Sequence, residues 1–254
     1  MKTLSINHLV LFFIIAVTII GCTNYVEDED SDYEKEFENN HDTWHSDVVK
    51  VVKSIKLDDV KSLDAEIVMG VGILKLTGGA KELAKVGFAY DIPNWKPELK
   101  YDINNDRGWL SIKQPDNKDI HIEGKPTYAW NIRLNNDIST DLDITLGAGS
   151  GKIFLSELNL KYLHLTIGVG KSEIDLKGNW DHDVDIEIDG GIGVTTLYLP
   201  EDVGVRVKVK RGFGKVNSKR LRKRKNIYTN KAYDSSDVTI NIKINAGIGA
   251  INLK

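Results

Sequence analysis

The chain has 254 residues, of which 41% are hydrophobic, and its 34 Lys and Arg side chains nearly balance its 37 Asp and Glu side chains. This apolar fraction permits a packed core in one domain of moderate size or in two small ones. A single cysteine excludes an intramolecular disulfide framework.

The first 22 residues have the layout of a secretory signal. A cation at Lys2 precedes an apolar run at residues 9–20, and the segment ends in Gly21 and Cys22. A small residue before cysteine is typical of a lipobox, because a peptidase can reach the bond and the thiol then accepts diacylglycerol. The alternative is an uncleaved membrane anchor, but a run of about 12 apolar residues is shorter than the roughly 20 that a spanning helix needs. The sequence therefore predicts a signal peptide at residues 1–21 and a protein that is extracytoplasmic and lipid-anchored to the bacterial membrane through Cys22.

Residues 22–46 are rich in acidic side chains. These are Glu27, Asp28, Glu29, Asp30, Asp32, Glu34, Glu36 and Glu38. Such a stretch repels itself and buries little apolar surface, so it predicts a disordered tether. His41 and His45 could bind Zn²⁺ or Cu²⁺ weakly, but a tether offers no fixed geometry, and we expect no metal site there.

The next part, residues 47–135, predicts a β-rich N-terminal subdomain. Valine dominates residues 46–61, which favours a strand over a short helix. We expect a short helical turn at residues 81–85, a turn near Trp95, and strands near Trp109 and at residues 128–132.

A G-x-G motif occurs six times along the chain. The glycine pairs are Gly70 and Gly72, Gly147 and Gly149, Gly168 and Gly170, Gly191 and Gly193, Gly212 and Gly214, and Gly247 and Gly249. Steps of 21, 23 and 21 residues separate the middle four pairs. Spacing this regular indicates a repeat architecture and predicts a β-solenoid over residues 136–254.

The apolar residues change phase at each glycine pair. Before the third pair they lie at odd offsets from its first glycine, as at Leu163 and Leu165, and after it at even offsets, as at Ile174 and Leu176. Such a change predicts a strand that turns a corner, where glycine tolerates angles that other residues avoid. The residue between the glycines follows the first phase, so we expect it to be buried like the residues before the corner.

Stacking of the repeats in chain order would bring two charged rows together. The acidic row is Asp185, Glu187 and Asp189, and the basic row is Arg206, Lys208 and Lys210. The sequence predicts that the two rows pair across adjacent strands. The final segment, residues 238–253, would then form an exposed edge of the stack.

Several stretches resemble a known family. They are Gly78-Gly79-Ala80, Trp95-Lys96-Pro97, Leu134-Asn135-Asn136-Asp137-Ile138, Leu146-Gly147-Ala148-Gly149-Ser150-Gly151, Gly190-Gly191-Ile192-Gly193, Leu199-Pro200 and Asp202-Val203-Gly204-Val205-Arg206-Val207. Over about residues 60–254 the chain is similar to the toast-rack family of bacterial envelope proteins, which is related to the C-terminal domain of cell-envelope stress regulators. The resemblance implies an all-β fold: a right-handed parallel β-solenoid with a smaller β-rich N-terminal subdomain. It supplies no established catalytic residue. Ser139, where proline is expected, and Arg211 are local departures from the family pattern.

Two motifs invite chemical interpretations that the sequence disfavours. A phosphate cradle needs its glycines between a strand and a helix, whereas strand follows glycine in every repeat here. The acidic residues Asp183, Asp185, Glu187 and Asp189 could bind Ca²⁺ or act as acid and base on a carbohydrate. We favour a solvated face whose charge the nearby basic row neutralises, and we expect no metal and no cofactor.

The basic residues near the C-terminal end are candidates for anion binding. They are Arg206, Lys208, Lys210, Arg220, Arg222, Lys223, Arg224 and Lys225. Export argues against a nucleic acid as their partner, which leaves the membrane surface, an anionic envelope polymer or another envelope protein. A solvated loop that only balances acids elsewhere is the alternative.

These observations favour a non-catalytic envelope protein over an enzyme, with a role as a scaffold, a sensor or an adhesion-like binding module. A second hypothesis is a solenoid that binds or processes envelope polysaccharide through a groove containing Asp183, Asp185, Glu187 or Tyr198. A third is partner binding by strand addition at the last strand.

Overall fold

The computed structural model describes residues 25–27, 48–116 and 126–254, and within them the protein is all-β. The helices of these residues are two single turns, η1 (Pro93–Trp95) and η2 (Ala232–Asp234), so none is long and apolar enough to cross a membrane. The strands are β1 (Tyr25–Glu27), β2 (Val49–Ile55), β3 (Ser62–Ala80), β4 (Ala84–Tyr90), β5 (Glu98–Asn104), β6 (Arg107–Lys113), β7 (Tyr128–Asn135), β8 (Ser139–Phe154), β9 (Leu160–Asp175), β10 (Val184–Tyr198), β11 (Gly204–Ser218), β12 (Arg222–Arg224), β13 (Ile227–Thr229) and β14 (Thr239–Leu253).

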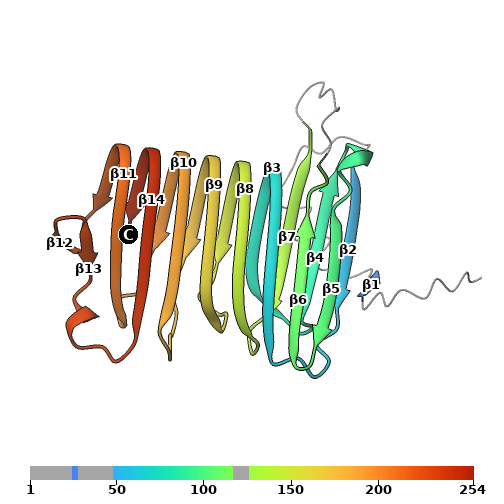
Figure 1. Cartoon of the computed structure of the whole chain (residues 1–254), viewed down its shortest axis with the longest axis horizontal. Helices are drawn as coiled ribbons and strands as arrows, with labels where there is room; N and C mark the ends of the chain where they lie inside the picture. The colour runs from blue at the N-terminus through green and yellow to red at the C-terminus, as the bar shows by residue number, and fades with distance from the viewer. Residues whose placement is uncertain (1–24, 28–47, 117–125) are drawn as a thin grey trace, which may run out of the picture.

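Six long strands form a stack of parallel rungs, in the order β3, β8, β9, β10, β14 and β11 (Figure 1). Neighbouring rungs are hydrogen-bonded in register along both halves of their length. This arrangement agrees with the parallel β-solenoid that the repeats predict. The stack is part of one large sheet, because all fourteen described strands are connected by pairing.

Each rung bends at its glycine pair, which divides it into a first half and a second half. The second glycines of the six pairs occupy one register column across the stack. At Gly193 φ is 150°, and a Cβ would lie 1.8 Å from the carbonyl oxygen of Gly170 on the next rung. Only glycine allows both this backbone angle and this approach, so the repeated motif is explained by the corner.

The core lies between the two halves of the rungs. Leu163 and Leu165 face inward from the first half of β9, and Ile174 and Leu176 face inward from its second half. The corner therefore converts odd offsets into even ones while keeping apolar side chains on the inside, as the phase of the sequence predicts.

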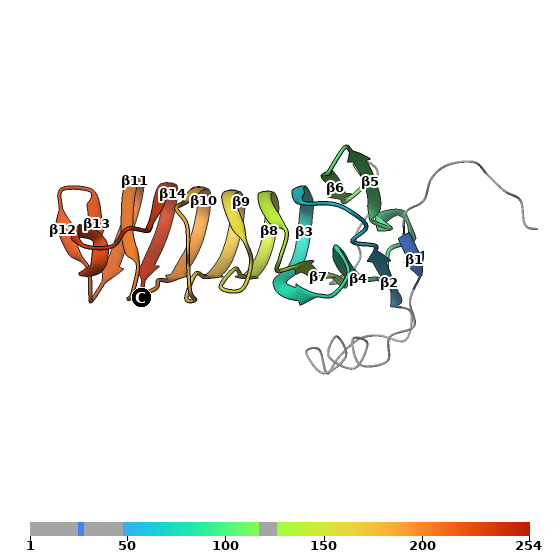
Figure 2. The same cartoon turned by 90° about the horizontal axis from the view of Figure 1, so that it is seen from below.

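The N-terminal part continues both halves of β3. Strands β6 and β5 extend the sheet beside the first half, and β7, β4, β2 and β1 extend it beside the second half (Figure 2). Gln114 bridges the corner between them: its Oε1 accepts hydrogen bonds from the backbone N–H groups of Gly70 (2.7 Å) and Val71 (2.9 Å).

Three details of this part differ from the sequence-based expectations. Strand β3 is already a rung of the stack, so the stack begins at Ser62 and not at residue 136. Residues 81–83 form a bend, followed directly by β4, and not a helical turn, because Asn135 Nδ2 donates to the carbonyl oxygens of Ala80 (3.1 Å) and Glu82 (3.1 Å). Within the expected tether, β1 pairs antiparallel with β2; the rest of that segment lies outside the described residues.

The order of the last rungs also differs from the chain order. After β11 the chain forms the β12–β13 hairpin and returns to place β14 between β10 and β11. The prediction that the last strand is an edge is therefore wrong, because β14 is paired on both sides.

The expected pairing of the acidic and basic rows is wrong for the same reason. Asp185 and Arg206 are both register partners of Asn241, so a full strand separates the two rows. Because β14 lies between β10 and β11, both edges of this apolar strand are hydrogen-bonded. The more polar and more exposed β11 is left at the end of the stack.

Candidate anion-binding site

The lipidation residue predicted from the sequence, Cys22, lies outside the described residues, as do His41 and His45. All twelve glycines of the motif are described, and they build the corner of the stack. Those that come first in each pair are also crowded: a Cβ at Gly191 would lie 2.2 Å from the carbonyl oxygen of Gly168. The motif is therefore used by the fold, and each copy is followed by strand.

Five of the six residues between the glycines are exposed, contrary to the expectation that they are buried, and the sixth, Ala148, is half-buried. Val169 and Ile192 are each 53% exposed, Ile248 is 56% exposed and Phe213 is 82% exposed. They lie at the outside of the corner, where the change of phase leaves no inward direction for their side chains. Together with Val71 they form an apolar ridge along the stack.

The acidic row of β10 is largely engaged by its neighbours. Asp189 accepts a hydrogen bond from Asn245 Nδ2 (2.8 Å), and this bond, outweighing burial, lowers its pKa. Glu187 is paired with Lys243 Nζ at 2.5 Å. Asp183 precedes the strand and accepts the backbone N–H of Thr239 (2.7 Å). The partners that neutralise the acidic row therefore come from β14 and β9, and not from the basic row. In the described part of the chain, no cluster of His, Cys, Asp and Glu has the arrangement of a metal site.

His164 of β9 lies between two carboxylates of that face. Its Nδ1 is 3.2 Å from Asp143 of β8, and its Nε2 is 3.2 Å from Asp189 of β10. Burial lowers the pKa of His164, but the hydrogen bonds to the two carboxylates outweigh burial and raise it above its ordinary value.

Five of the basic residues predicted to bind anions share one outer surface. Arg206, Lys208 and Lys210 project from β11, and Arg222 and Arg224 project from β12; we call this surface the basic face. Through β13, Arg206 is aligned with Arg222, and Lys208 with Arg224. Aligned cations therefore lie two strands apart, at about 10 Å. The ion pair recorded on this face joins Arg222 to Asp234 (2.6 Å).

The other three predicted residues lie elsewhere. Lys223 faces the opposite side of the hairpin, where its Nζ lies 5.5 Å from the centroid of the Tyr228 ring. Lys225 is in the hairpin turn with φ of 57°. Arg220 is paired with Glu201 at the rim of a groove.

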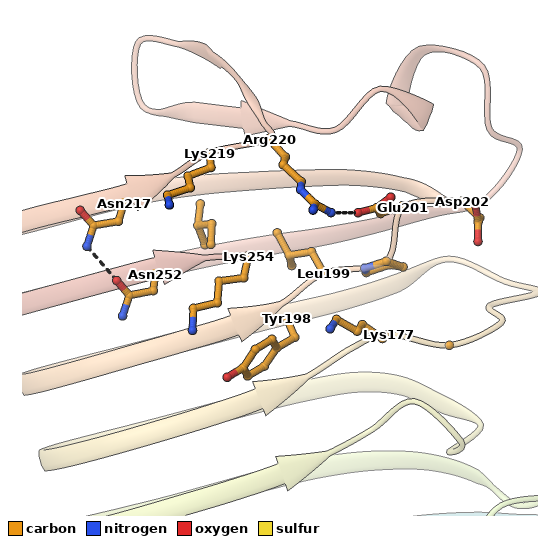
Figure 3. A pocket seen from close by; sticks show the side chains of 13 residues that line it. Lys177, Tyr198, Leu199, Glu201, Asp202, Asn217, Lys219, Arg220, Asn252 and Lys254 are labelled. Atoms are coloured by element: carbon orange, nitrogen blue, oxygen red, sulfur yellow. Dashed lines mark hydrogen bonds and ion pairs between the residues drawn. The ribbon is translucent and has the colours of Figure 1, made fainter.

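That groove has a volume of about 860 Å³ (Figure 3). It crosses the ends of the second halves of β10, β14 and β11 and is bounded by residues 199–202. Its cationic residues are Lys177, Lys219, Arg220 and Lys254, against two acidic residues, Glu201 and Asp202. A volume of this size is typical of ligand sites, which range over roughly 300–1,000 Å³.

Tyr198 is the aromatic side chain of the groove. The Nζ atoms of Lys177 and Lys254 lie 5.0 Å and 5.1 Å from the centroid of its ring. Figure 3 shows the two lysines reaching toward the tyrosine from the segments that follow β9 and β14. The negative face of the ring favours these positions for the two ammonium groups.

Amide side chains continue the groove across the neighbouring rungs. Asn217 Nδ2 donates to Asn252 Oδ1 (2.8 Å), and Asn252 Nδ2 donates to Thr196 Oγ1 (3.1 Å). The bounding segment is fixed by buried Asn230, whose Nδ2 donates to the carbonyl oxygens of Pro200 (3.2 Å) and Val203 (2.7 Å).

The sequence-based reasoning named Tyr198 but missed the lysines beside it. Tyr198, Lys219 and Lys254 each lie seven residues after the first glycine of their repeat, so equal offsets could have grouped them. The strand order was required to see that β14 stands between the other two. The sequence-based reasoning placed Asp183, Asp185 and Glu187 in one groove with Tyr198. Asp183 precedes β10, and Asp185 and Glu187 lie in its first half, so none of the three lines the groove.

Comparisons with known proteins agree with the fold. A family model described as the N-terminal domain of toast_rack matches residues 44–198, and another, described as "cell wall-active antibiotics response LiaF, C-terminal", matches residues 148–253. No curated protein matches the chain.

Among solved structures, the chain is similar to a "putative cell adhesion protein" from Clostridium sporogenes. The two share 37% identity over 82% of this chain and 99% of that chain, with a TM-score of 0.79. A "putative adhesin" from Bacteroides fragilis shares 9% identity over 83% of this chain and 98% of that chain, with a TM-score of 0.22. A TM-score this low supports no inference.

Proposed function

Because the chain belongs to the toast-rack family, we propose that it is a non-catalytic protein of the bacterial cell envelope and acts as an adhesion-like binding module. The solved relative at 37% identity is described as a "putative cell adhesion protein", which supports this role. The proposal includes a right-handed winding of the stack, the usual hand of crossovers between parallel strands.

The basic face is the observation that carries the proposal. Five cations from two strands are held on one sheet, and among the described residues only Arg222 has a carboxylate partner there. Arg206, Lys208, Lys210 and Arg224 have no ion pair within the described part of the chain, so an external anion does not have to displace one. The face therefore suits an anionic surface of the envelope.

Lipid anchoring is the second part of the proposal. The apolar segment before Cys22 and the small residue at Gly21 support cleavage and acylation at that cysteine. A lipid at the N-terminal end would hold the protein at a membrane while the basic face contacts anionic material nearby. Diacylglycerol supplies two acyl chains, which are enough for stable anchoring, so attachment to the membrane does not depend on the basic face.

Cell fractionation tests both parts with the full chain. We expect the unaltered protein in the membrane fraction, metabolically labelled by palmitate, and a Cys22→Ala variant to lose the label. A variant with Lys208→Gln, Lys210→Gln and Arg224→Gln should keep the label but bind anionic phospholipid vesicles about tenfold more weakly at low salt.

The matched control is Lys56→Gln, Lys96→Gln and Lys100→Gln, which removes three exposed cations from the N-terminal part. This variant should bind the vesicles as the unaltered protein does. Absence of label would refute anchoring through Cys22, and equal losses in both triple variants would refute the assignment to the basic face.

A further inference from the structure

The groove over Tyr198 differs from the basic face in shape and chemistry. The basic face is a sheet surface that carries cations, whereas the groove combines cations with an aromatic ring and a row of amides. It lies on the second half of the rungs, and the basic face lies on the first half.

The charges of the groove favour an anionic ligand. Lys177, Lys219 and Lys254 have no carboxylate within ion-pair distance among the residues that the structure describes, and only Arg220 is paired, with Glu201. An acidic ligand would therefore meet cations that are not held by a carboxylate, although Lys177 and Lys254 contact the neutral ring of Tyr198. Hydrogen bonds between ammonium and carboxylate are among the stronger polar contacts in proteins.

The remaining lining favours a ligand with hydroxyl groups and C–H faces. Asn217 and Asn252 use one N–H each in their ladder, so each amide keeps further donor or acceptor capacity. The ring of Tyr198 offers a flat surface whose negative face attracts the weakly positive C–H groups of a sugar ring. Carboxylate, hydroxyl and C–H faces together are the chemistry of an acidic sugar.

The length of the hollow favours a polymer over a single sugar. A second hollow, of about 750 Å³, begins at Lys177 and Gly178 and continues over the turns that contain Leu158 and Trp180. The two hollows share those two residues and so follow one another across successive rungs (Figure 1). Asp137, Glu157 and Asp181 line the second hollow, so the carboxylates of a polymer would be bound in the first hollow.

We propose that this groove binds an acidic polysaccharide, with Tyr198 under a sugar ring and Lys177, Lys219 and Lys254 on its carboxylates. The inference deepens the proposed function, because it names the ligand class of the binding module and rests on that role. Asn230 is a positioning residue, since it fixes the segment 200–203 that bounds the groove.

Binding of polygalacturonate to the detergent-solubilised full chain tests the inference, with dextran as the neutral polymer. We expect saturable binding of polygalacturonate and none of dextran. Lys177→Gln with Lys254→Gln should weaken polygalacturonate binding about tenfold, which corresponds to about 1.4 kcal/mol. Tyr198→Ala should weaken it about fivefold and Tyr198→Phe much less, because the ring is what matters.

Strand β8, which lies within three rungs of the centre of the groove, supplies matched controls. Phe154 is 38% exposed on β8 at the same offset from its glycine as Tyr198, and Lys152 is an exposed lysine on the same strand. Phe154→Ala and Lys152→Gln should leave polygalacturonate binding unchanged. Melting temperatures within a few degrees of the unaltered protein would exclude misfolding as the cause of a loss.

Three results would overturn the inference: equal binding of dextran, unchanged binding by the groove variants, or loss of vesicle binding but not of polymer binding in those variants. The last result would assign the groove to a membrane surface. Palmitate labelling and binding through the basic face are independent of these outcomes, so failure of the groove proposal is distinguishable from failure of the proposed function.

Discussion

The two ends of the stack are completed differently. At the N-terminal end, β6 continues the first half of β3, β7 continues its second half, and Gln114 binds the corner between them. At the C-terminal end, β13 continues the first half of β11, while no described strand pairs with residues 211–218 on their outer side.

The charges differ in the same way. Near the N-terminal end, Asp64 is paired with Arg107, and Glu66 with Lys113 at 2.7 Å. Near the C-terminal end, most cations of the basic face and the groove have no such partner among the described residues. The difference indicates that the first end closes the fold and the second end presents charge to the exterior.

The largest expected effect tests whether the two ends are parts of one continuous stack. Gly193→Ala would place a Cβ 1.8 Å from the carbonyl oxygen of Gly170, so we expect a loss of about 4 kcal/mol or more of unfolding free energy. Gly79→Ala is the control, since Gly79 also has a positive φ (93°) but has no atom within 4 Å of the Cβ position. It should cost about 1 kcal/mol. Urea unfolding measures both, and equal costs would contradict the close-approach explanation.

A second pair of substitutions compares how much each end contributes to the free energy of unfolding. Trp130 is 1% exposed and packs edge-on against Phe88, with 5.6 Å between ring centroids. Trp130→Ala should cost about 3–5 kcal/mol in cooperative unfolding. Tyr228→Ala removes a ring that is 5% exposed but lines a surface hollow at the C-terminal hairpin, and it should cost about 2 kcal/mol because that site can relax. A larger loss at Tyr228 would reverse the assigned roles of the two ends.

The corner bridge at Gln114 sharpens the comparison further. Gln114→Ala leaves the N–H groups of Gly70 and Val71 without their side-chain acceptor and should cost about 1–2 kcal/mol. Gln114→Glu keeps an oxygen acceptor and should cost less. Thermal unfolding of the two variants measures the difference; equal destabilisation would show that the side-chain oxygen is not what closes this corner.

The smallest expected effect concerns pH and the middle of the stack. Because the pKa of His164 is raised in the folded protein, its protonation stabilises the fold below the ordinary histidine pKa of about 6.5, and this contribution is lost as pH rises through the folded pKa. The lowered pKa of Asp189 contributes stability that is lost in acid, as pH falls through the folded pKa of this carboxyl group. Unfolding free energy should therefore be slightly higher near pH 5.5 than near pH 8.5, and His164→Gln should remove that difference. An unchanged pH dependence in this variant would contradict it.

Much of the stack follows from the sequence because its physical causes are local. Glycines at fixed spacing and a change of apolar phase are enough to predict bent strands with one buried side. The order of the rungs is not local: it depends on how β14 competes with β11 for the edge of β10, which no offset in the sequence records. The predicted pairing of Glu187 with Lys208 failed for this reason, and Lys243 takes its place.

The candidate site was predictable only in part. The basic residues were evident as a cluster in the sequence, but side chains alternate along β12, so Lys223 and Arg224 point to opposite sides. The groove joins Lys177, Tyr198, Lys219 and Lys254 from four different segments. Tyr198, Lys219 and Lys254 share one offset in their repeats. Lys177 does not, so the structure was needed to place it in the groove.

Amide hydrogen exchange with and without polygalacturonate tests the central claim most directly, that the C-terminal end binds while the N-terminal end closes the fold. We predict slow exchange in β3 and β7 whether or not the polymer is present. The polymer should slow exchange at residues 177–178 and 198–202 and at the ends of β11 and β14. Protection that appears at β3, β6 and β7 instead, or no change anywhere at a saturating concentration of polymer, would contradict the account.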